Sequence, residues 1–214
     1  MLYMDFIEID METYPRRKHF EHFYSMHYPY AGITSDVDVT DLVSFCKAHH
    51  YSFYLTFLHI AALAADNVRE FRQRIHNKGI VEYAHCPTSH IELLDNGTYC
   101  YCTLHHQLPL DAYIEYAEKT RKLCREKGSI EEDEAVESMY FISTMPWRHY
   151  TALIQPVAGG EDSNPRITWG KFQKDHDGRL QMPVSVLVHH GLADGIHIAQ
   201  FYQSLEKRIQ ETIS

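Results

Sequence analysis

The stretch that decides the fold reads Met182-Pro183-Val184-Ser185-Val186-Leu187-Val188-His189-His190-Gly191-Leu192-Ala193-Asp194-Gly195. Its first half is a nearly continuous apolar run, which is typical of a strand buried inside a sheet. Two histidines and a tight Asp-Gly turn then end the strand. Because a strand end holds a side chain rigidly and imidazole titrates near neutral pH, this stretch favours a general base at the end of a buried strand.

The sequence on either side of this stretch predicts a mixed β-sheet with helices packed on it. Apolar runs and alternation predict strands at 7–11, 80–83, 89–94, 98–104, 140–143, 150–155 and 167–173. Helical spacing predicts helices at 16–25, 52–68 and 110–128, and a last helix whose inner stripe is Ile198, Phe201, Leu205 and Ile209. The segment 36–41 is expected to contain an extended piece and the start of a helix. The expected fold class is α/β, as an α+β two-layer arrangement with helices largely on one face, and we expect a single domain spanning 1–214.

The chain is long enough to build a core without covalent cross-links. Its 214 residues, 44% of them hydrophobic, can bury roughly 70% of the surface that the unfolded chain exposes. The five cysteines are odd in number and form no Cys-x-x-Cys pair, so we expect free thiols and no zinc site. The start of the chain has no signal-peptide pattern and no apolar run reaches transmembrane length, which favours a cytoplasmic protein that does not enter the membrane.

The formal net charge of −9 limits the partners that the protein can attract. Nucleic acid would be repelled at long range, so we do not expect it as a partner. Coenzyme A is also anionic, and its binding would need local lysines and arginines that offset the overall field. Part of the negative charge lies in the acidic run at 131–134, which reads as a solvated loop.

Four segments resemble one enzyme family and follow the family's order. His189 to Gly195 resembles the His-His-x-x-x-Asp-Gly signature of the chloramphenicol acetyltransferases, which the related acyltransferase cores of 2-oxoacid dehydrogenase complexes share. Segments 14–23, 53–60 and 141–147 resemble the family's Arg-Lys-x-His-Phe, Phe-Tyr-x-x-Phe-x-His-Ile and Ser-x-x-Pro-Trp motifs. This resemblance spans nearly the whole chain and implies the chloramphenicol acetyltransferase-like fold, which is the CoA-dependent acyltransferase fold.

The resemblance implies an acyl transfer that depends on two residues. His190, the second histidine of the pair, would take the proton of the acceptor hydroxyl directly, without an acyl-enzyme. Ser143 aligns with the serine whose hydroxyl supports the oxyanion of the tetrahedral intermediate. Acetyl-CoA would be the donor, and no metal would be required. His189 is expected to point to the opposite face of the sheet and to have no chemical role.

The resemblance also implies residues that support this catalytic pair. Asp194 would form an ion pair with Arg16 and fix the loop after the histidines, rather than act as the carboxylate of a Ser-His-Asp triad. Thr168 aligns with a threonine near the acceptor and the coenzyme. Phe23 aligns with an aromatic residue near the acceptor pocket.

Departures from the family pattern fall mainly on the acceptor pocket. Gln155 stands where the family has a leucine that lines this pocket, and Ile196 replaces an aromatic residue. Leu187 and Gly191 replace the usual glutamine before the histidine pair and the small alanine or serine after it. A buried amide would seek a partner on the acceptor. We therefore expect the acyl-CoA chemistry to be retained and chloramphenicol to be a poor acceptor.

Two further histidine pairs, His49-His50 and His105-His106, could suggest a metal site. Neither pair has cysteine or acidic ligands at a recognised spacing, so we expect solvated surface histidines and no bound metal. The sequence also contains no Gly-rich phosphate loop and no dinucleotide-binding fingerprint.

Together these patterns predict an acetyl-CoA-dependent O-acetyltransferase of the chloramphenicol acetyltransferase type. It would acetylate a hydroxyl of chloramphenicol or of a related small acceptor, as an antibiotic-resistance enzyme does. The family is trimeric with each active site between neighbouring subunits, so the resemblance implies a homotrimer. Two alternatives stay open. One is an acyltransferase that acts on a thiol acceptor such as a lipoyl group, and the other is a catalytically weak member that serves in binding or assembly.

Overall fold

The computed structural model describes residues 6–132 and 134–214. Its strands are β1 (Phe6–Glu8), β2 (Tyr30–Asp38), β3 (Gln73–His76), β4 (Gly79–Tyr83), β5 (Thr88–Leu93), β6 (Tyr99–Leu104), β7 (Tyr140–Met145), β8 (Arg166–Gly170), β9 (Gln173–Lys174) and β10 (Leu180–His189). The α-helices are α1 (Arg17–Tyr24), α2 (Thr40–Ala48), α3 (Phe53–Asp66), α4 (Leu110–Lys127) and α5 (Gly195–Ile213), with short 3-10 helices at Arg69–Arg72 and Val136–Ser138.

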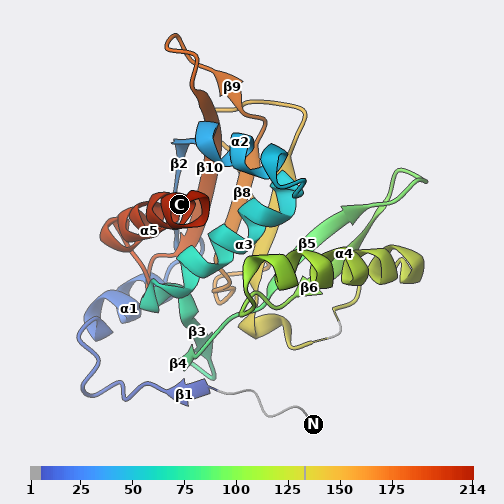
Figure 1. Ribbon diagram of the computed structural model, residues 1–214. Helices are drawn as coiled ribbons and strands as arrows, with labels where there is room; N and C mark the ends of the chain where they lie inside the picture. Colours follow the sequence, from blue (N-terminus) through green and yellow to red (C-terminus); the bar gives the residue numbers. More distant parts are fainter. Residues whose placement is uncertain (1–5, 133) are drawn as a thin grey trace.

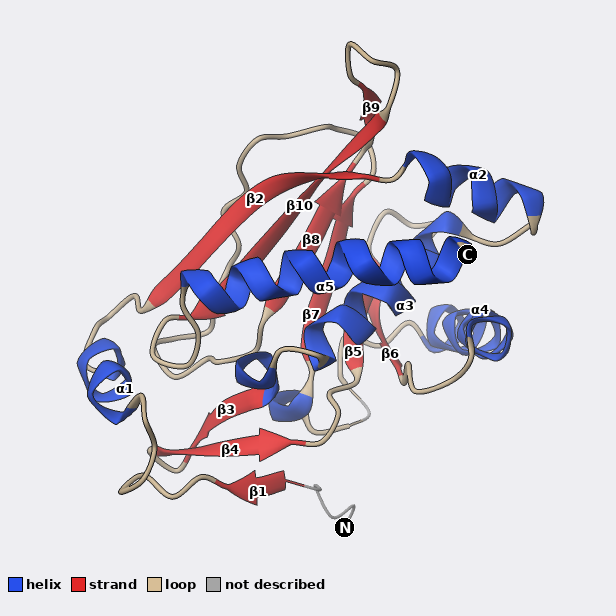
Figure 2. Ribbon diagram, turned by 60° about the vertical axis from the view of Figure 1, so that its left-hand side comes forward, coloured by secondary structure: helices blue, strands red, loops and turns tan. Residues whose placement is uncertain are grey.

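A seven-stranded mixed sheet forms the centre of the molecule (Figures 1 and 2). Its strand order is β2-β10-β8-β7-β5-β6, and β9 pairs with β10 beside this path. β7 runs parallel to β5 and to β8, whereas the other pairs are antiparallel. The predicted mixed α/β fold is therefore confirmed, and the apolar run at 182–188 lies within the strand β10.

The apolar run forms β10 because both faces of the strand are covered. Val184, Val186 and Val188 belong to the main core cluster and are at most 3% exposed. β-branched residues at alternate positions fit a pleated, buried surface well. Ser185 on the opposite face is also 3% exposed. This double burial accounts for a run that is apolar at nearly every position.

Helices cover one face of the large sheet (Figures 1 and 2). Ser52 caps α3, accepting a hydrogen bond from the Leu55 N–H at 3.4 Å, and most of that helix is buried. α5 packs beside α3 and buries Phe201 completely. α4 ends at Gly128, whose φ of 63° is the left-handed conformation that glycine adopts easily. Across the described ranges, no helix combines the length and the apolar character needed to span a membrane.

A second, three-stranded sheet lies near α1 (Figure 2). The sequence predicts two of its strands, at 7–11 and 80–83, but not that they pair in a sheet of their own. Its order is β1-β4-β3 and its pairs are antiparallel. A small buried cluster joins it to α1, formed by Tyr14, Phe20, Ile75, Ile80 and Leu192. Because Leu192 follows the histidine pair in the sequence, this cluster holds α1 against the end of β10.

Three predicted strands have the wrong extent. The segment 150–155 forms no strand, because the neighbouring strand β8 already pairs with β7 on one side and with β10 on the other. No free edge of β8 is left for a further strand. The strand predicted at 167–173 divides into β8 and β9, and the strand predicted at 7–11 is shorter, because β1 ends at Glu8.

Two observed strands lie where the patterns predict little or none. β2 extends over nine residues, although only the part from Asp36 is expected to be extended. Gly32 and Ser35 have little intrinsic preference for strands, and pairing with β10 along the whole of β2 overrides that preference. The sequence does not predict β3, because the polar residue Arg74 interrupts its apolar pattern. Arg74 is nevertheless buried, because its guanidinium donates to backbone carbonyls, including that of Met139 at 2.9 Å.

We expect Phe201→Ala to lower the free energy of unfolding by about 3–5 kcal/mol, because it leaves a cavity in a packed core. The Phe201 ring is fully buried and stacks on Phe71 with 5.6 Å between the ring centroids. Equilibrium unfolding in urea measures the change. Gln203→Ala, on the exposed side of the same helix, is the matched control and should stay within about 0.5 kcal/mol. Equal effects of the two substitutions would contradict the described packing of α5.

Candidate active site

Four hydroxyl side chains form a row across the large sheet. Ser143 on β7 lies opposite Thr168 on β8, and Thr168 lies opposite Ser185 on β10. Ser185 in turn lies opposite Thr34 on β2, with 2.7 Å between the two hydroxyl oxygens. Strand neighbours alternate between faces, and Ile167 belongs to the core under the helices. The row therefore lies on the face of the sheet that is turned away from the helices.

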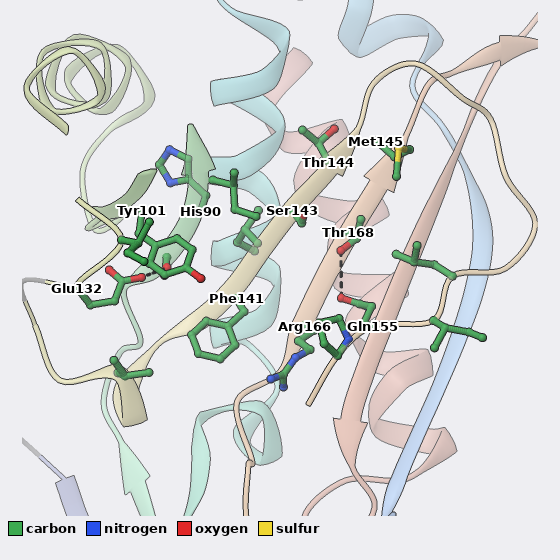
Figure 3. Close-up of a pocket in the computed structure, with 18 of the residues that line it drawn as sticks. His90, Tyr101, Glu132, Phe141, Ser143, Thr144, Met145, Gln155, Arg166 and Thr168 are labelled. Atoms are coloured by element: carbon green, nitrogen blue, oxygen red, sulfur yellow. Dashed lines mark hydrogen bonds between the residues drawn. The ribbon is translucent and has the colours of Figure 1, made fainter. Parts of the chain in front are cut away.

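A cavity of about 720 Å³ opens at the Ser143 end of this row (Figure 3). Its walls come from β5, β6, β7 and β8 and from the irregular segments that follow α4 and β7. Ile91, Phe141 and Leu153 give it a largely apolar lining, and Ser143 and Thr168 are among its polar groups. A cavity of this size suits a drug-sized molecule.

Gln155 lies in the wall of the same cavity and faces Thr168 (Figure 3). The Thr168 hydroxyl donates to the Gln155 amide oxygen at 3.1 Å. The expectation that this amide must find its partner on the acceptor therefore needs correction, because its oxygen already accepts a hydrogen bond within the chain.

Arg166 is a charged member of the cavity wall that the sequence patterns did not single out. It stands two residues before Thr168 on β8, so strand alternation could have placed both side chains on one face. Its guanidinium contacts the Asp162 carboxylate at 3.1 Å and 2.5 Å, and it lies over the Phe141 ring at 5.0 Å from the centroid. The positive charge of Arg166 is therefore balanced inside the protein.

Glu132 is the second unexpected member of the wall, and it lies across the cavity from Gln155 (Figure 3). It belongs to the acidic run that was expected to be a solvated loop, and that expectation is wrong for this residue. The Ser89 and Thr103 hydroxyls both donate to its carboxylate, the second at 2.8 Å. No periodic signal in the sequence indicates this position, because the segment after α4 forms neither a helix nor a strand here.

His190 lies away from this cavity within the same chain. It is the first residue beyond β10, its N–H donates to the Pro29 carbonyl at 2.7 Å, and its ring stacks on Phe23 with 4.0 Å between the centroids. The register places Ser185 in the row that contains Ser143. His190 follows Ser185 at roughly 3.4 Å per residue, which separates it from the row by roughly 17 Å along the strand. One chain therefore does not bring Ser143 and His190 together.

His189 has contacts of a different kind. Its Nε2 donates to the Gly160 carbonyl at 2.9 Å, and its Nδ1 accepts a hydrogen bond from the Gly191 N–H at 3.1 Å. Burial lowers the pKa of His189, which keeps the imidazole neutral. A Cβ atom at Gly191 would come within 3.0 Å of this ring. Alanine or serine at this position would therefore require the His189 ring to shift by a few tenths of an ångström.

Arg16 and Asp194 form an ion pair, with 2.5 Å between Nη1 and Oδ2. Asp194 is also the residue that precedes α5, and its N–H donates to Nδ1 of His197 at 3.0 Å. Partial burial would raise the pKa of the Asp194 carboxyl, but the hydrogen bond and the charge of Arg16 hold that pKa below its ordinary value. The pair thus joins the start of α1 to the start of α5.

A second hollow of about 570 Å³ shares part of its wall with the first and carries positive charge. Arg121 and Arg125 on α4 and Lys171 after β8 line it, together with the Trp169 indole. Arg121 is paired with the buried Glu92 carboxylate. Arg125 is half exposed and Lys171 is exposed, so these two are the cations most accessible to an anionic ligand.

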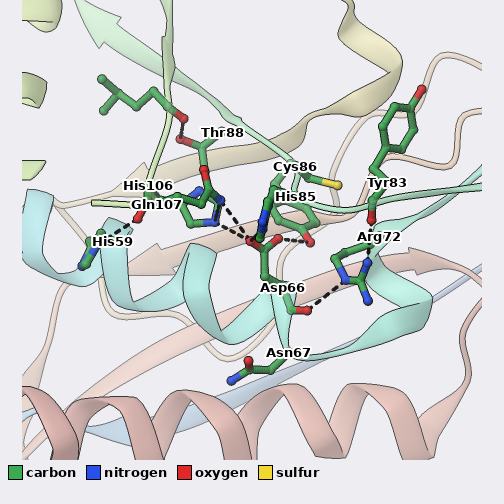
Figure 4. A network of polar contacts seen from close by, with 12 residues as sticks. His59, Asp66, Asn67, Arg72, Tyr83, His85, Cys86, Thr88, His106 and Gln107 are labelled. Atoms are coloured by element: carbon green, nitrogen blue, oxygen red, sulfur yellow. Dashed lines mark hydrogen bonds and ion pairs between the residues drawn. The ribbon is translucent and has the colours of Figure 1, made fainter. Parts of the chain in front are cut away.

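The expectation of solvated surface histidines is wrong for His106, whose side chain is fully buried (Figure 4). Its Nε2 lies 2.8 Å from the Asp66 carboxylate, to which the Tyr140 hydroxyl also donates at 2.9 Å. His105 instead pairs with Glu134 at the surface. The Asp66 carboxylate is buried and therefore requires hydrogen-bond partners, and burial of His106 supplies one of them. Among the described residues, no group of three or more potential ligands is arranged to hold a metal ion.

The fold and its likeness to solved enzymes identify the class of protein as an acyltransferase. The profile of the family "Chloramphenicol acetyltransferase" matches residues 4–206, and the chain belongs to this family. The predicted family is therefore confirmed.

The relatives are similar along nearly their whole length. Chloramphenicol acetyltransferase 3 of Escherichia coli is 26% identical over 208 residues, which cover 95% of this chain and 97% of that protein. A solved chloramphenicol acetyltransferase is 25% identical, with a TM-score of 0.82 over 95% of this chain and 99% of that one. A dihydrolipoamide acetyltransferase of Azotobacter vinelandii shares the fold at 15% identity, with a TM-score of 0.69 over 91% of this chain and 86% of that one.

Arg16 and Asp194 should show coupled effects on stability. Arg16→Gln and Asp194→Asn each leave a partly buried charge without its partner, so the double variant should lose less than the sum of the single losses, by about 1–2 kcal/mol. Urea unfolding of the four proteins at pH 7 measures this coupling. Strictly additive losses would remove the ion pair as a source of stability.

The same cycle has a predicted dependence on pH. The folded-state pKa of Asp194 is lowered, so its stabilising contribution is complete above the unfolded-state value of 3.8. The contribution is lost as the pH falls through the lower folded-state pKa. The coupling measured at pH 7 should therefore persist at pH 5 and disappear in stronger acid.

Proposed function

We propose that the protein is an acetyl-CoA-dependent O-acetyltransferase that acetylates a hydroxyl of a small acceptor. His190 takes the acceptor proton as the oxygen attacks the thioester carbonyl, and the Ser143 hydroxyl donates a hydrogen bond to the oxyanion that forms. Collapse of this intermediate breaks the C–S bond, and the departing thiolate takes the proton from the imidazolium. The products are the acetyl ester and free coenzyme A.

The observation that carries this proposal is the separation of the two groups within one chain. Ser143 opens into the cavity, whereas His190 lies against Phe23 beyond the far end of β10. A second copy of the chain, bringing its own His190 over the cavity, would complete the site. We therefore infer a homotrimer in which each active site takes Ser143 from one subunit and His190 from the next.

The exposed rim of the cavity supports an arrangement of this kind. Ile91 is 41% exposed, Ile130 is 64% exposed and Ile154 is 94% exposed, and all three line the cavity. Apolar side chains gathered at one exposed place are typical of a surface that another protein covers. Contact with a second copy would bury this rim and remove water from the site, which strengthens hydrogen bonds to a developing oxyanion.

The second hollow supports acetyl-CoA as the donor. Coenzyme A brings several phosphate charges to a protein whose net charge is −9, so the phosphates need a local positive region. Arg125 and Lys171 offer accessible cations there, and the Trp169 ring offers an apolar surface. The wall that this hollow shares with the first cavity would let the thioester reach Ser143.

Because the relatives are named chloramphenicol acetyltransferases, chloramphenicol is the first acceptor to test. Resistance to chloramphenicol is the first phenotype to look for in cells that express the protein. The shared fold of the dihydrolipoamide acetyltransferase adds a dihydrolipoyl thiol to the panel as the alternative acceptor class. We also infer that the enzyme works in the reducing cytoplasm, which its five unpaired cysteines suit.

His190→Ala and Ser143→Ala should each abolish most of the acyl transfer, by about 10²-fold or more, with the fold retained. Mixing the two variants during refolding should restore activity, because a site can then take an intact Ser143 from one chain and an intact His190 from its neighbour. About one site in four would be complete in a random mixture of equal amounts. Release of free thiol from acetyl-CoA measures all of these activities.

The matched control is His189→Gln, which keeps the fold contacts of His189 in part and leaves His190 in place. It should lower the free energy of unfolding, whereas the folded protein should keep most of its acetyl-transfer activity. If the mixture of His190→Ala and Ser143→Ala stays inactive although it forms mixed trimers, the proposal of a shared site is wrong. Full activity in His190→Ala alone would overturn the assignment of the base.

Gln155 should make chloramphenicol a poor acceptor. An amide in place of a leucine adds polarity to an apolar wall, and we expect kcat/KM for chloramphenicol at least about tenfold below that of a typical resistance enzyme. Gln155→Leu should narrow this difference, and Gln107→Leu, outside the cavity, should not. Efficient turnover of chloramphenicol by the unmodified protein, unchanged in Gln155→Leu, would show that the wall does not set the preference.

A further inference from the structure

The large cavity contains a carboxylate whose charge is not balanced by the described residues. Glu132 lines the cavity, and no Lys, Arg or His within 6–132 or 134–214 forms an ion pair with it. Resting on the function proposed above, we propose that the natural acceptor carries a cationic ammonium group that binds Glu132, in addition to the hydroxyl that is acetylated. The chemical class is thus a cationic amino alcohol with an apolar body.

The first support is the way in which the Glu132 carboxylate is held. The Ser89 hydroxyl donates to Oε1, and the Thr103 hydroxyl donates to Oε2 at 2.8 Å. Both donors are neutral, so they fix the position of the carboxylate without cancelling its charge. They stand opposite each other on β5 and β6, which makes the support rigid. A rigid, uncompensated carboxylate in a cavity wall selects for a positive ligand group.

The second support is the charge balance of the remaining wall. Arg166 lines the cavity, and its guanidinium is already paired with Asp162. His90 also lines the cavity, and its ring lies 3.2 Å from the Glu92 carboxylate, outside the wall. Glu131 also lines the cavity and adds a further negative charge at its mouth. The described wall therefore has a net negative charge. A neutral acceptor that displaced water from the cavity would leave this charge without a partner, which is unfavourable.

The third support is the chemistry of the surfaces near Glu132. The Tyr101 ring lies beside Glu132 in the cavity wall, and Phe141 lies between Glu132 and Arg166 (Figure 3). Aromatic faces attract ammonium groups, and most strongly where water is excluded. The same rings, with Ile91 and Leu153, accommodate an apolar body.

The strand register sets the expected distance between the two functional groups of the acceptor. Ser89, which holds Glu132, lies opposite Phe141 on β7, and Ser143 is the next residue of β7 on the same face. One strand spacing and two residues of rise separate Ser89 from Ser143 by roughly 8 Å. The acceptor should therefore place its hydroxyl and its cation at about this separation.

Two isosteric probes test the inference. The cationic probe is 4-(trimethylammoniomethyl)benzyl alcohol, and the neutral probe is 4-(2,2-dimethylpropyl)benzyl alcohol, in which carbon replaces the nitrogen. The two molecules have the same shape and the same primary hydroxyl, and the quaternary nitrogen cannot itself be acetylated. Their kcat/KM values with acetyl-CoA are compared for the wild-type enzyme, for Glu132→Gln and for Glu134→Gln.

The wild-type enzyme should prefer the cationic probe by about tenfold at low salt, and added KCl should reduce this preference. Glu132→Gln should abolish the preference. Glu134→Gln removes the same charge from the same acidic run, but Glu134 pairs with His105 and does not line the cavity, so the preference should remain. The salt dependence of the wild-type enzyme provides a test that does not depend on how well a variant folds.

Equal use of the two probes by the wild-type enzyme, or an equal loss of preference in both variants, would overturn the inference while leaving the acetyltransferase proposal intact. Calorimetric binding of each probe in the presence of free coenzyme A separates the two proposals. Tighter binding of the cationic probe, dependent on Glu132 but without any acetyl transfer, would support the inference and overturn the proposed function.

Discussion

Hydrogen bonding of β10 to β2 on one side and to β8 on the other is the constraint on which the rest of the structure depends. The pairing with β8 fixes Thr168 and, one strand further, Ser143 in a single row. The pairing with β2 continues to His189, so the chain leaves the sheet directly before His190. One register thus sets both the position of the hydroxyl in the cavity and the place at which the second imidazole leaves the sheet.

The contacts around Asp194 show how the chain after β10 is held in place. Its carboxylate binds Arg16 and its backbone begins α5, while the Leu192 side chain packs into the small cluster beside α1. His189 ties the same region to the segment before β8 through the Gly160 carbonyl. Three separate parts of the sequence therefore meet around the end of β10, and the geometry near His190 rests on all of them.

The sequence was most informative where an element has a strong apolar pattern of its own or is fixed by contacts between residues close together in the chain. The apolar run of β10 and the Ser52 cap of α3 predicted their elements well. The failure at 150–155 arose because strand formation needs a free edge, and the occupancy of β8 on both sides is a property of the tertiary fold. Glu132 could not be found from its own segment, since the partners that hold it, Ser89 and Thr103, come from a distant hairpin.

The wall that contains Gln155 is built differently from the row that contains Ser143. The segment 150–165 includes no helix or strand, whereas Ser143 and Thr168 lie on paired strands of the central sheet. A substitution in such a segment changes the shape and charge of the cavity without breaking a ladder of backbone hydrogen bonds. Substitutions in this one surface segment can therefore change which molecules the cavity accepts, while the paired strands that carry Ser143 and Thr168 stay intact.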